Sequence, residues 1–332
     1  MKILVTGASG FIGNFLLDAL RDAAHEVRAA SRSRVEKQGI DYVSAPELGP
    51  DANWSRALNG VDVVIHLAGR AHVPSKNADA ETDEVYFRIN TEGTRALAEQ
   101  AAAAGANHFV FLSSCHAVAA ESEVQITEKT QSNPLTAYGH SKLEAERAIP
   151  KALSNTACAW TILRPPLVYG KGNKANFGLL LKLVKSGIPL PLASVRNRRS
   201  FIYVENLVDV IVACLGNPKA YGKTYLPSDG EDVSTPELIR KIAKANLSFQ
   251  FSEFSGSVSD KNTRRPSLAT RDSARLFPFP ESALKAMGRL PGLGALRKLT
   301  SSLYVDSEPL RKDLGWNPRF TMEEGLLKTL IS

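Results

Sequence analysis

The sequence has few cysteines and no apolar run long enough to cross a membrane. Its cysteines are odd in number and scattered, without the spacing of a disulfide framework or a zinc site (Cys115, Cys158 and Cys214). The six histidines form no pair on one helix face, so we assign no metal. No apolar stretch approaches the ~20 residues that span a bilayer, and the N-terminus MKILVTGASG has too short an apolar run for a secretory signal. These absences favour a cytoplasmic protein with reduced thiols.

The charge of the chain leans to the basic side. Its 41 Lys and Arg residues exceed the 34 Asp and Glu residues, which gives a net charge of +7. A cationic protein suits an anionic ligand, and nucleic acid is the extreme case. The basic stretch VRNRRSF (195–201) lacks an aromatic-interleaved ribbon or a helix-turn-helix pattern. We therefore expect a phosphorylated small molecule and no nucleic acid.

Short apolar runs alternate with helical patterns in the first half of the chain. The runs that predict strands lie at 2–7, 26–31, 61–69, 107–114 and 157–165. Between these runs, apolar residues spaced three and four apart predict helices, as in FIGNFLLDALRDA, which begins at Phe11. Continuous apolar strands alternating with helices indicate a parallel sheet covered on both faces. The chain is therefore predicted to be an α/β protein.

A glycine-rich turn joins the first predicted strand to the first predicted helix. The motif TGASGFIG places Gly7, Gly10 and Gly13 three residues apart. Glycines at such a junction allow a sharp turn and a close approach to a pyrophosphate, which the N–H groups of the helix N-terminus bind. In this strand–turn–helix context the motif predicts dinucleotide binding. The fold class is then a Rossmann-type doubly wound parallel sheet with a smaller, mixed C-terminal substrate domain.

Beyond Pro165 the regular alternation loosens. Helical patterns cover 177–187 and 204–217, and the segment 248–302 is expected to be irregular because it is rich in Ser, Pro and Gly. The predicted domains are an NAD(P)-binding Rossmann domain over 1–166, to which the chain returns near 199–216, and a substrate-binding domain over 167–198 and 217–332.

The end of the second predicted strand bears on which dinucleotide is bound. NAD-binding proteins place an acidic residue about 20 residues beyond the glycine turn, where it binds the ribose hydroxyls. Here Ser31 occupies that place, with Arg32 beside it and Arg34 nearby. An arginine can pair with the 2′-phosphate of NADP. The sequence thus favours NADP(H) over NAD, with a solvated Arg32 as the alternative.

The pentapeptide YGHSK places a tyrosine one helical turn ahead of a lysine. Tyr138 and Lys142 share a helix face. A nearby ammonium and an oxidised nicotinamide would both lower the tyrosine pKa from about 10 toward neutral pH, so that the phenol can move a proton. Ser113 and Ser114 end a strand where parallel sheets bind ligands. A lone Tyr-x-x-x-Lys match is usually a surface pair, but the glycine turn and the strand-end serine together indicate catalysis.

Eight motifs follow one another along the chain: TGASGFIG, DVVIHLAG, FRINTEGT, FVFLSS, YGHSK, LRPPLVYG, NRRSFIYVENLVD and DLGWNP. With them the sequence resembles the extended short-chain dehydrogenases/reductases, in particular the UDP-galactose 4-epimerase-like nucleotide-sugar epimerase/dehydratase family. The resemblance runs from Lys2 to beyond Trp316. Within that family the sequence is more similar to a branch from bacterial polysaccharide synthesis.

The resemblance implies roles for residues at matching positions. Tyr138 would be the proton shuttle, Lys142 would bind the nicotinamide ribose, and Ser114 would hydrogen-bond the substrate, with Ser113 as the alternative one position away. Near the adenine of the cofactor, the matching residues would be Glu47 and Leu48, with Asp51 as the alternative. The implied cofactor contacts are Gly7, Gly10, Phe11, Ile12, Gly13, Ser31, Arg32, Glu47, Leu48, Leu67, Ala68, Gly69, Asn90, Tyr138, Lys142 and Pro166.

The implied substrate contacts are Ser114, Asn176 and Arg199, the last two at the diphosphate. Two departures bear on the sugar: AVAA at 117–120 replaces the usual Val-Tyr-Gly, and Leu167 stands where relatives have a substrate-contacting Asn. They favour UDP-N-acetylhexosamines or 6-deoxy relatives over the ordinary glucose/galactose pair, and some relatives act on lipid-linked sugars. The segment 282–299 is apolar and basic, but its Gly and Pro residues interrupt a membrane-surface helix, so we do not expect membrane contact.

Two other residues receive structural rather than catalytic interpretations. His66 lies inside an apolar run, so we expect a packed and hydrogen-bonded core residue. Cys115 has no base partner visible in the sequence, so we do not propose a thiol nucleophile.

Together the motifs predict an enzyme, an NAD(P)-dependent nucleotide-sugar 4-epimerase of the UDP-glucose/UDP-N-acetylhexosamine type. It would transfer hydride at C4 through a 4-keto intermediate. An NADPH-dependent UDP-4-keto-sugar reductase or 4-dehydrogenase of the UDP-N-acetylquinovosamine type is the alternative, because Arg32 favours an exchangeable cofactor. A non-catalytic NADPH-binding regulatory protein ranks last, because both Tyr138 and Lys142 are present. The expected partner is a nucleotide-activated sugar, and a homodimer stays open.

Overall fold

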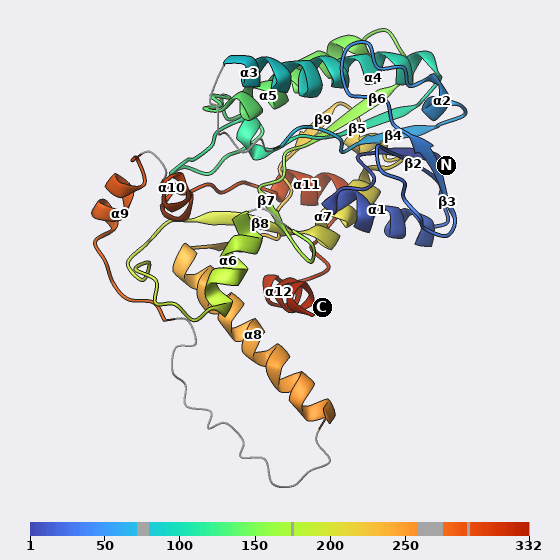
Figure 1. The fold of residues 1–332 in the computed structure, drawn as a ribbon. Helices are drawn as coiled ribbons and strands as arrows, with labels where there is room; N and C mark the ends of the chain where they lie inside the picture. Colours follow the sequence, from blue (N-terminus) through green and yellow to red (C-terminus); the bar gives the residue numbers. More distant parts are fainter. Residues whose placement is uncertain (72–79, 174–175, 258–274, 291–292, 332) are drawn as a thin grey trace.

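The computed structural model describes residues 1–71, 80–173, 176–257, 275–290 and 293–331 (Figure 1). Its largest element is a seven-stranded sheet of order β3-β2-β1-β4-β5-β6-β9, in which every neighbouring pair is parallel. The strands are β1 Lys2–Thr6, β2 Glu26–Ser31, β3 Ile40–Ser44, β4 Val63–His66, β5 His108–Leu112, β6 Ala159–Leu163 and β9 Lys223–Tyr225. The α/β prediction is confirmed.

Apolar side chains on both faces of the sheet explain why helices cover both sides. Along β1, Ile3 and Val5 pack toward one face with α1 (Phe11–Asp22) and α7 (Val204–Cys214). Leu4 points the other way and belongs to a second core with α4 (Gly93–Ala103) and α5 (Ala137–Ala152). Figure 1 shows α4 and α5 above the sheet and α1 and α7 below it. Alternation within a strand thus places a separate core on each face.

Short helices lie on the loops of the seven-stranded sheet. Three helices lie on the loops that leave the strands, together with one π-helical turn that leads into α4. They are α2 Ser55–Leu58, α3 Ala80–Tyr86, the π-helix η1 Phe87–Glu92 and the 3₁₀ helix η2 Cys115–Ala117. π-helical turns are rare and are often found at functional sites.

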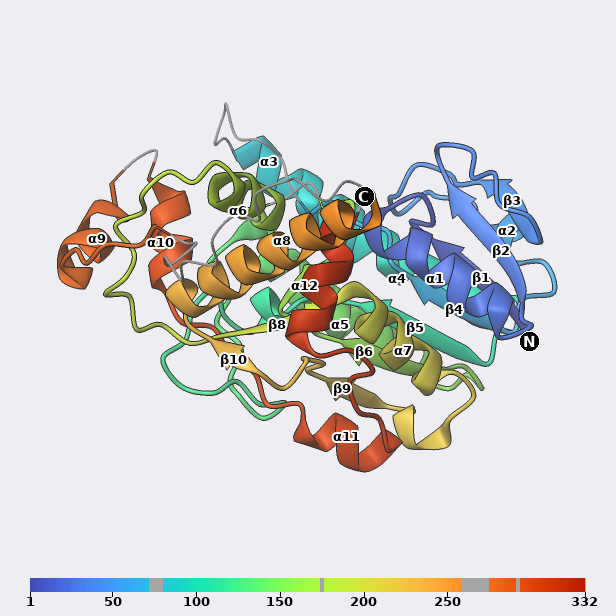
Figure 2. The same ribbon diagram turned by 90° about the horizontal axis from the view of Figure 1, so that it is seen from below.

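A smaller mixed sheet lies beside the large one. Its order is β10-β8-β7, with β7 (Leu167–Tyr169) parallel and β10 (Asp232–Val233) antiparallel to β8 (Arg199–Tyr203). Figure 2 shows α12 packed across α8 beneath this region. The remaining elements are η3 Pro218–Ala220, α6 Asn176–Lys185, α8 Thr235–Ser257, α9 Glu281–Met287, α10 Gly294–Thr300, α11 Glu308–Leu314 and α12 Met322–Leu330.

The structure differs from the expected organisation in three places. β3 was not expected, because only Val43 in IDYVS is buried. β9 lies in the segment assigned to the substrate domain, yet it pairs with β6 in the large sheet. The segment 248–302 was expected to be irregular, but α8 continues into it as far as Ser257, and α9 and α10 both lie within it. The division into two domains stays a prediction.

In the part of the chain that the structure describes, no helix combines the length and apolarity needed to cross a membrane.

Candidate active site

The glycine turn between β1 and α1 leaves no room for a side chain at Gly7 or Gly13. Gly7 has a φ of +70°, and a Cβ there would lie 2.8 Å from the backbone N of Ala68. A Cβ at Gly13 would lie 2.6 Å from the carbonyl oxygens of both Gly7 and Ala8. Gly10 closes the turn, its N–H donating to the Gly7 carbonyl at 2.9 Å. The turn therefore requires glycine for steric reasons, as the sequence predicted.

The N-terminus of α1 fits a pyrophosphate. Gly10 caps the helix without a side-chain hydrogen bond, and the first turn carries no acidic residue. Phe11 and Ile12 pack partly against the core of the smaller layer, so their side chains anchor the helix start between the two layers. Uncapped N–H groups at the positive end of a helix dipole bind anions. These residues therefore fit the dinucleotide predicted for them.

The end of β4 borders both the glycine turn and α5. Leu67 and Ala68 donate backbone N–H groups to Thr6, at 3.3 Å to its carbonyl and 3.4 Å to its Oγ1. A Cβ on Gly69 would lie 3.0 Å from Oδ1 of Asn90 and 3.4 Å from Nζ of Lys142. Gly69 therefore lies where the predicted cofactor contacts converge.

Asn90 links the loop after β4 to α5. It is buried within η1, and its Oδ1 accepts from the Arg70 N–H at 2.8 Å. Its Nδ2 donates to the Arg70 carbonyl at 3.1 Å and to Oγ of Ser141 at 2.9 Å. All these partners belong to the protein, so Asn90 fixes the relative position of the two segments.

Lys142 is a buried ammonium on α5. Its Nζ donates to the Leu112 carbonyl at 2.9 Å and lies 4.5 Å from the ring centroid of Phe111. Burial lowers the pKa of Lys142 to about 8, and the charge of Glu146 acts in the opposite direction. The lysine is thus held at the end of β5, in a place where its charge is costly.

Tyr138 is half-buried one turn earlier on α5. Burial raises the pKa of Tyr138 to about 12, whereas a side-chain hydrogen bond from Ser114 lowers it. The sequence predicted a lowered pKa, and for the chain alone that direction is wrong. The physical reason is that the prediction counted the charges of Lys142 and the nicotinamide but not desolvation.

The structure separates the two candidate serines. Ser113 is buried and its hydroxyl donates to the carboxylate of Glu146. Ser114 is half-buried, accepts from the His116 N–H at 3.2 Å and hydrogen-bonds toward Tyr138. The contacts therefore favour Ser114 over Ser113 as the residue that acts with the phenol.

Two further rings lie against Tyr138 that the sequence did not single out. Tyr86, at the end of α3, and His116, on η2, each lie 6.3 Å from Tyr138 between ring centroids, in edge-on geometry. They come from separate elements, so no sequence period could have shown them. They restrict the directions in which the phenol can turn.

Arg199 is the first residue of β8 and lies near the end of β5, since its charge acts on Cys115. Its Nη1 donates to the carbonyls of Lys298, at 2.6 Å, and of Ser301, at 3.2 Å. Its charge acts on the thiol of Cys115, which follows Ser114. Burial lowers the pKa of Arg199.

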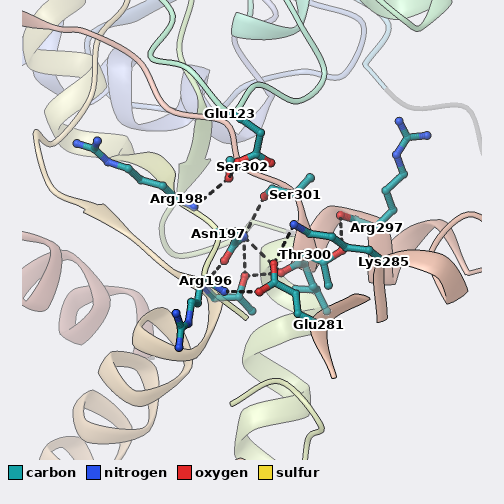
Figure 3. A network of polar contacts seen from close by, with 12 residues as sticks. Glu123, Arg196, Asn197, Arg198, Glu281, Lys285, Arg297, Thr300, Ser301 and Ser302 are labelled. Atoms are coloured by element: carbon teal, nitrogen blue, oxygen red, sulfur yellow. Dashed lines mark hydrogen bonds and ion pairs between the residues drawn. The ribbon is translucent and has the colours of Figure 1, made fainter. Parts of the chain in front are cut away.

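Within the described segments, no carboxylate bonds directly to Arg199. Glu121, whose charge reaches Arg199, is bound by Arg297 at 2.5 and 3.2 Å. Figure 3 shows the polar network at the end of α10, where Asn197 contacts Ser301 and Ser302 contacts Glu123. Among the described residues Arg199 makes no ion pair and bonds only to neutral oxygens.

The predicted adenosine contacts are more dispersed. Ser31 is buried and its Oγ donates to the Ser33 carbonyl at 2.5 Å. Arg32 is exposed and makes no hydrogen bond or ion pair within the described chain. Glu47, Leu48 and Asp51 line one surface cavity of about 240 Å³. The structure therefore does not choose between the two alternatives for the adenine.

For two predicted contacts the structure gives only their position in the fold. Pro166 is buried just before β7. Asn176 begins α6, and its side chain lies outside the described residues.

The structural interpretation of His66 is confirmed. His66 is fully buried, with Nδ1 2.6 Å from Thr6 Oγ1 and Nε2 3.0 Å from Thr94 Oγ1. Burial raises the pKa of the Cys115 thiol to about 12, so no thiolate forms at neutral pH. In the described segments no three His, Cys, Asp or Glu residues lie together as a metal site would require.

A glycine turn that fits a dinucleotide, next to a helix carrying Tyr138 and Lys142, defines an extended short-chain dehydrogenase/reductase. The model of the NAD dependent epimerase/dehydratase family matches residues 3–226. The UDP-glucose 4-epimerase of Vibrio cholerae is 36% identical over 333 residues, which cover 99% of this chain and 94% of the relative. The chain belongs to the NAD dependent epimerase/dehydratase family and is an NAD-dependent enzyme.

Solved structures agree with the fold. UDP-N-acetylglucosamine 4-epimerase from Bacillus cereus is similar with a TM-score of 0.75 and 19% identity, over 100% of this chain and 98% of that chain. UDP-glucuronic acid 4-epimerase from Bacillus cereus, in complex with NAD, is similar with a TM-score of 0.72 and 22% identity, over 99% and 97%. At these identities the similarity shows the fold alone.

Proposed function

We propose that the chain is a nucleotide-sugar 4-epimerase that inverts C4 of a UDP-glucose or UDP-N-acetylhexosamine substrate through a 4-keto intermediate. The observation that carries the proposal is the meeting of Tyr138, Ser114 and Lys142 at the end of β5, beside Gly69. The 36% identity to a UDP-glucose 4-epimerase over nearly the whole chain supports it.

Each side chain has a distinct task in the proposed reaction. When bound, NAD takes up and returns a hydride at C4 of the sugar. Tyr138 removes the proton from the 4-hydroxyl and later returns it, while Ser114 donates a hydrogen bond to the oxygen that becomes the ketone. Lys142, held at the end of β5 one helical turn from Tyr138, would bind the nicotinamide ribose.

The hydrogen bonds of Arg199 support a diphosphate-containing substrate. Its half-buried guanidinium bonds only to neutral oxygens of the described residues, which leaves the group able to pair with an anion. Guanidinium groups bind phosphate oxygens with well-defined geometry. Arg199 is therefore proposed to bind the diphosphate, together with Asn176.

Because of Arg32, NADP(H) is proposed as an alternative to NAD for the cofactor. The exposed side chain of Arg32 makes no hydrogen bond or ion pair with the described residues, which would allow it to bind a 2′-phosphate. An NADPH-dependent 4-keto-sugar reductase would follow if the dinucleotide exchanges. The cytoplasmic location and the homodimer stay predictions.

The test compares Tyr138→Phe with a matched control, Tyr221→Phe, at a partly exposed tyrosine outside the site. Inversion of UDP-glucose and UDP-N-acetylglucosamine is followed by NMR, and nucleotide released on denaturation is identified by mass spectrometry. We expect Tyr138→Phe to lose at least ~100-fold in turnover while retaining its dinucleotide, because general acid–base catalysis contributes about that much. Full activity in Tyr138→Phe, or a wild-type enzyme that inverts neither sugar, would refute the proposal.

A further inference from the structure

A buried ion pair lies directly behind the proposed catalytic residues. Glu146 on α5 and Arg164, which follows β6, have side chains only 4% and 11% exposed. Nη2 of Arg164 donates to Oε2 of Glu146 at 2.6 Å, and Nε lies 3.1 Å from each carboxylate oxygen. Because desolvation offsets much of the attraction in such pairs, well-packed apolar residues would often give equal stability. The position of this pair therefore suggests a role in the reaction.

The pair fixes the end of β5 from which Ser114 projects. The hydroxyl of Ser113 donates to Glu146. The N–H of Ser113 donates to the Leu163 carbonyl at 2.7 Å, and that of Cys115 donates to the Pro165 carbonyl at 3.0 Å. Both neighbours of Ser114 are thus held by the segment that contains Arg164, and one of them is also held by α5.

Glu146 also lies one helical turn beyond Lys142, on the same face of α5. Its negative charge opposes the effect of burial on the pKa of Lys142. Other polar groups near the ammonium include the Leu112 carbonyl, Oδ1 of Asn90 across Gly69, and His66, which is neutral because burial lowers its pKa to about 3. Tyr138 lies one turn away and burial raises its pKa to about 12, so it stays neutral as well.

Among the described residues, Glu146 is therefore the carboxylate whose charge acts on Lys142. Arg164 holds this carboxylate in place from the far side.

We infer that Glu146 is a positioning residue for the epimerase reaction, which orients the Ser113–Ser114 end of β5 and keeps the Lys142 ammonium charged. The inference rests on the proposed function, because it assumes the roles given there to Ser114 and Lys142. It adds Arg164 as the residue that fixes the Glu146 carboxylate.

The experiment compares three variants. Glu146→Gln keeps the shape of the side chain and removes its charge. The double variant Glu146→Gln/Arg164→Met also removes the arginine, so that no buried guanidinium is left unpaired if the single variant folds poorly. Ser113→Ala removes the hydroxyl and leaves the carboxylate in place. Each is purified as the full chain, and its folding is checked by circular dichroism.

The first measurement is the titration of Lys142 itself. The Nζ resonance is followed by NMR in the ¹⁵N-lysine-labelled chain and assigned by its absence in Lys142→Met. We expect Lys142 to titrate about one pH unit lower in Glu146→Gln, since an opposite charge nearby shifts a pKa by at least that much. In the double variant the shift should be smaller, because the positive charge of Arg164 is removed together with the negative one. Ser113→Ala should leave the titration unchanged.

The second measurement is the pH dependence of kcat with a UDP-sugar. In each of the two Glu146 variants the alkaline limb should move to lower pH by the amount that its Lys142 titration shifts, while Ser113→Ala lowers kcat without moving it. An unchanged Lys142 titration in a folded charge-removing variant would overturn the inference, and so would full kcat in Ser113→Ala. If the wild-type chain inverts no UDP-sugar, the proposed function fails, whereas the titration still decides whether Glu146 acts on Lys142.

Discussion

Replacing Lys142 by methionine should make the stability of the protein depend on pH in a new way. The pKa of this lysine falls from 10.5 to about 8 on folding, because burial penalises the charged form. At 1.36 kcal/mol per pH unit, the buried ammonium lowers the free energy of unfolding by about 3 kcal/mol at pH 7. Methionine keeps the apolar stem and removes this penalty.

Methionine also leaves the Leu112 carbonyl without its donor, which costs about 1–3 kcal/mol. At pH 7 the two effects should leave Lys142→Met between equally stable and about 2 kcal/mol more stable than the wild type. Above pH 8 the folded wild type releases its proton while the unfolded chain keeps it, so wild-type stability rises with pH. Between pH 7 and pH 10 the variant should therefore lose about 2–3 kcal/mol relative to the wild type.

The assay is urea unfolding followed by tryptophan fluorescence at pH 7 and pH 10. Lys129→Met, at an exposed lysine, serves as the control, and its difference from the wild type should be equal at the two pH values. Other groups titrate alike in variant and wild type, so they cancel in the difference. A Lys142→Met difference that stays constant with pH would show that the ammonium is not held at an energetic cost.

Three further predictions follow from single contacts. Gly13→Ala would place a Cβ 2.6 Å from two carbonyl oxygens, so we expect a loss of about 1–3 kcal/mol in urea unfolding and at least tenfold weaker NAD binding by calorimetry; unchanged affinity would contradict the turn's role. Arg199→Met should raise KM for a UDP-sugar by ~10-fold or more, with kcat changed less, whereas Arg198→Met, at an exposed side chain, should not. Arg32→Ala should weaken NADP binding about tenfold and leave NAD binding unchanged if Arg32 reads the 2′-phosphate, and equal effects on both would remove the preference.

The parts of the site that could be predicted are those fixed by local geometry. Gly7 must adopt a positive φ and Gly13 cannot carry a Cβ, so the turn is visible as a spacing of glycines. Tyr138 and Lys142 share a face because helical positions four apart always do. Strands such as β4 and β5 are buried along their whole length, so they appear as continuous apolar runs.

The elements that were missed depend on their neighbours more than on their own sequence. β3 is the edge strand, with one buried residue out of five, and its place comes from hydrogen bonds to β2. β9 has three residues, and only pairing with β6 makes it a strand of the large sheet. Neither strand is long or apolar enough to stand out in a periodicity analysis.

Burial is what the sequence could not supply at the active site, and it changes the electrostatic reasoning there. Loss of water raises the pKa of an acid and lowers that of a base, so Tyr138 and Lys142 are both shifted toward their neutral forms. The proposed reaction needs the opposite, a phenol that gives up its proton beside a lysine that keeps one. Two contacts oppose the effect of burial: the hydrogen bond from Ser114 to Tyr138 and the charge of Glu146 near Lys142. In the sequence, Glu146 precedes an arginine in a helical segment, a pattern typical of a solvated surface charge. Only the fold places it against Ser113, where its carboxylate can favour the charged form of Lys142.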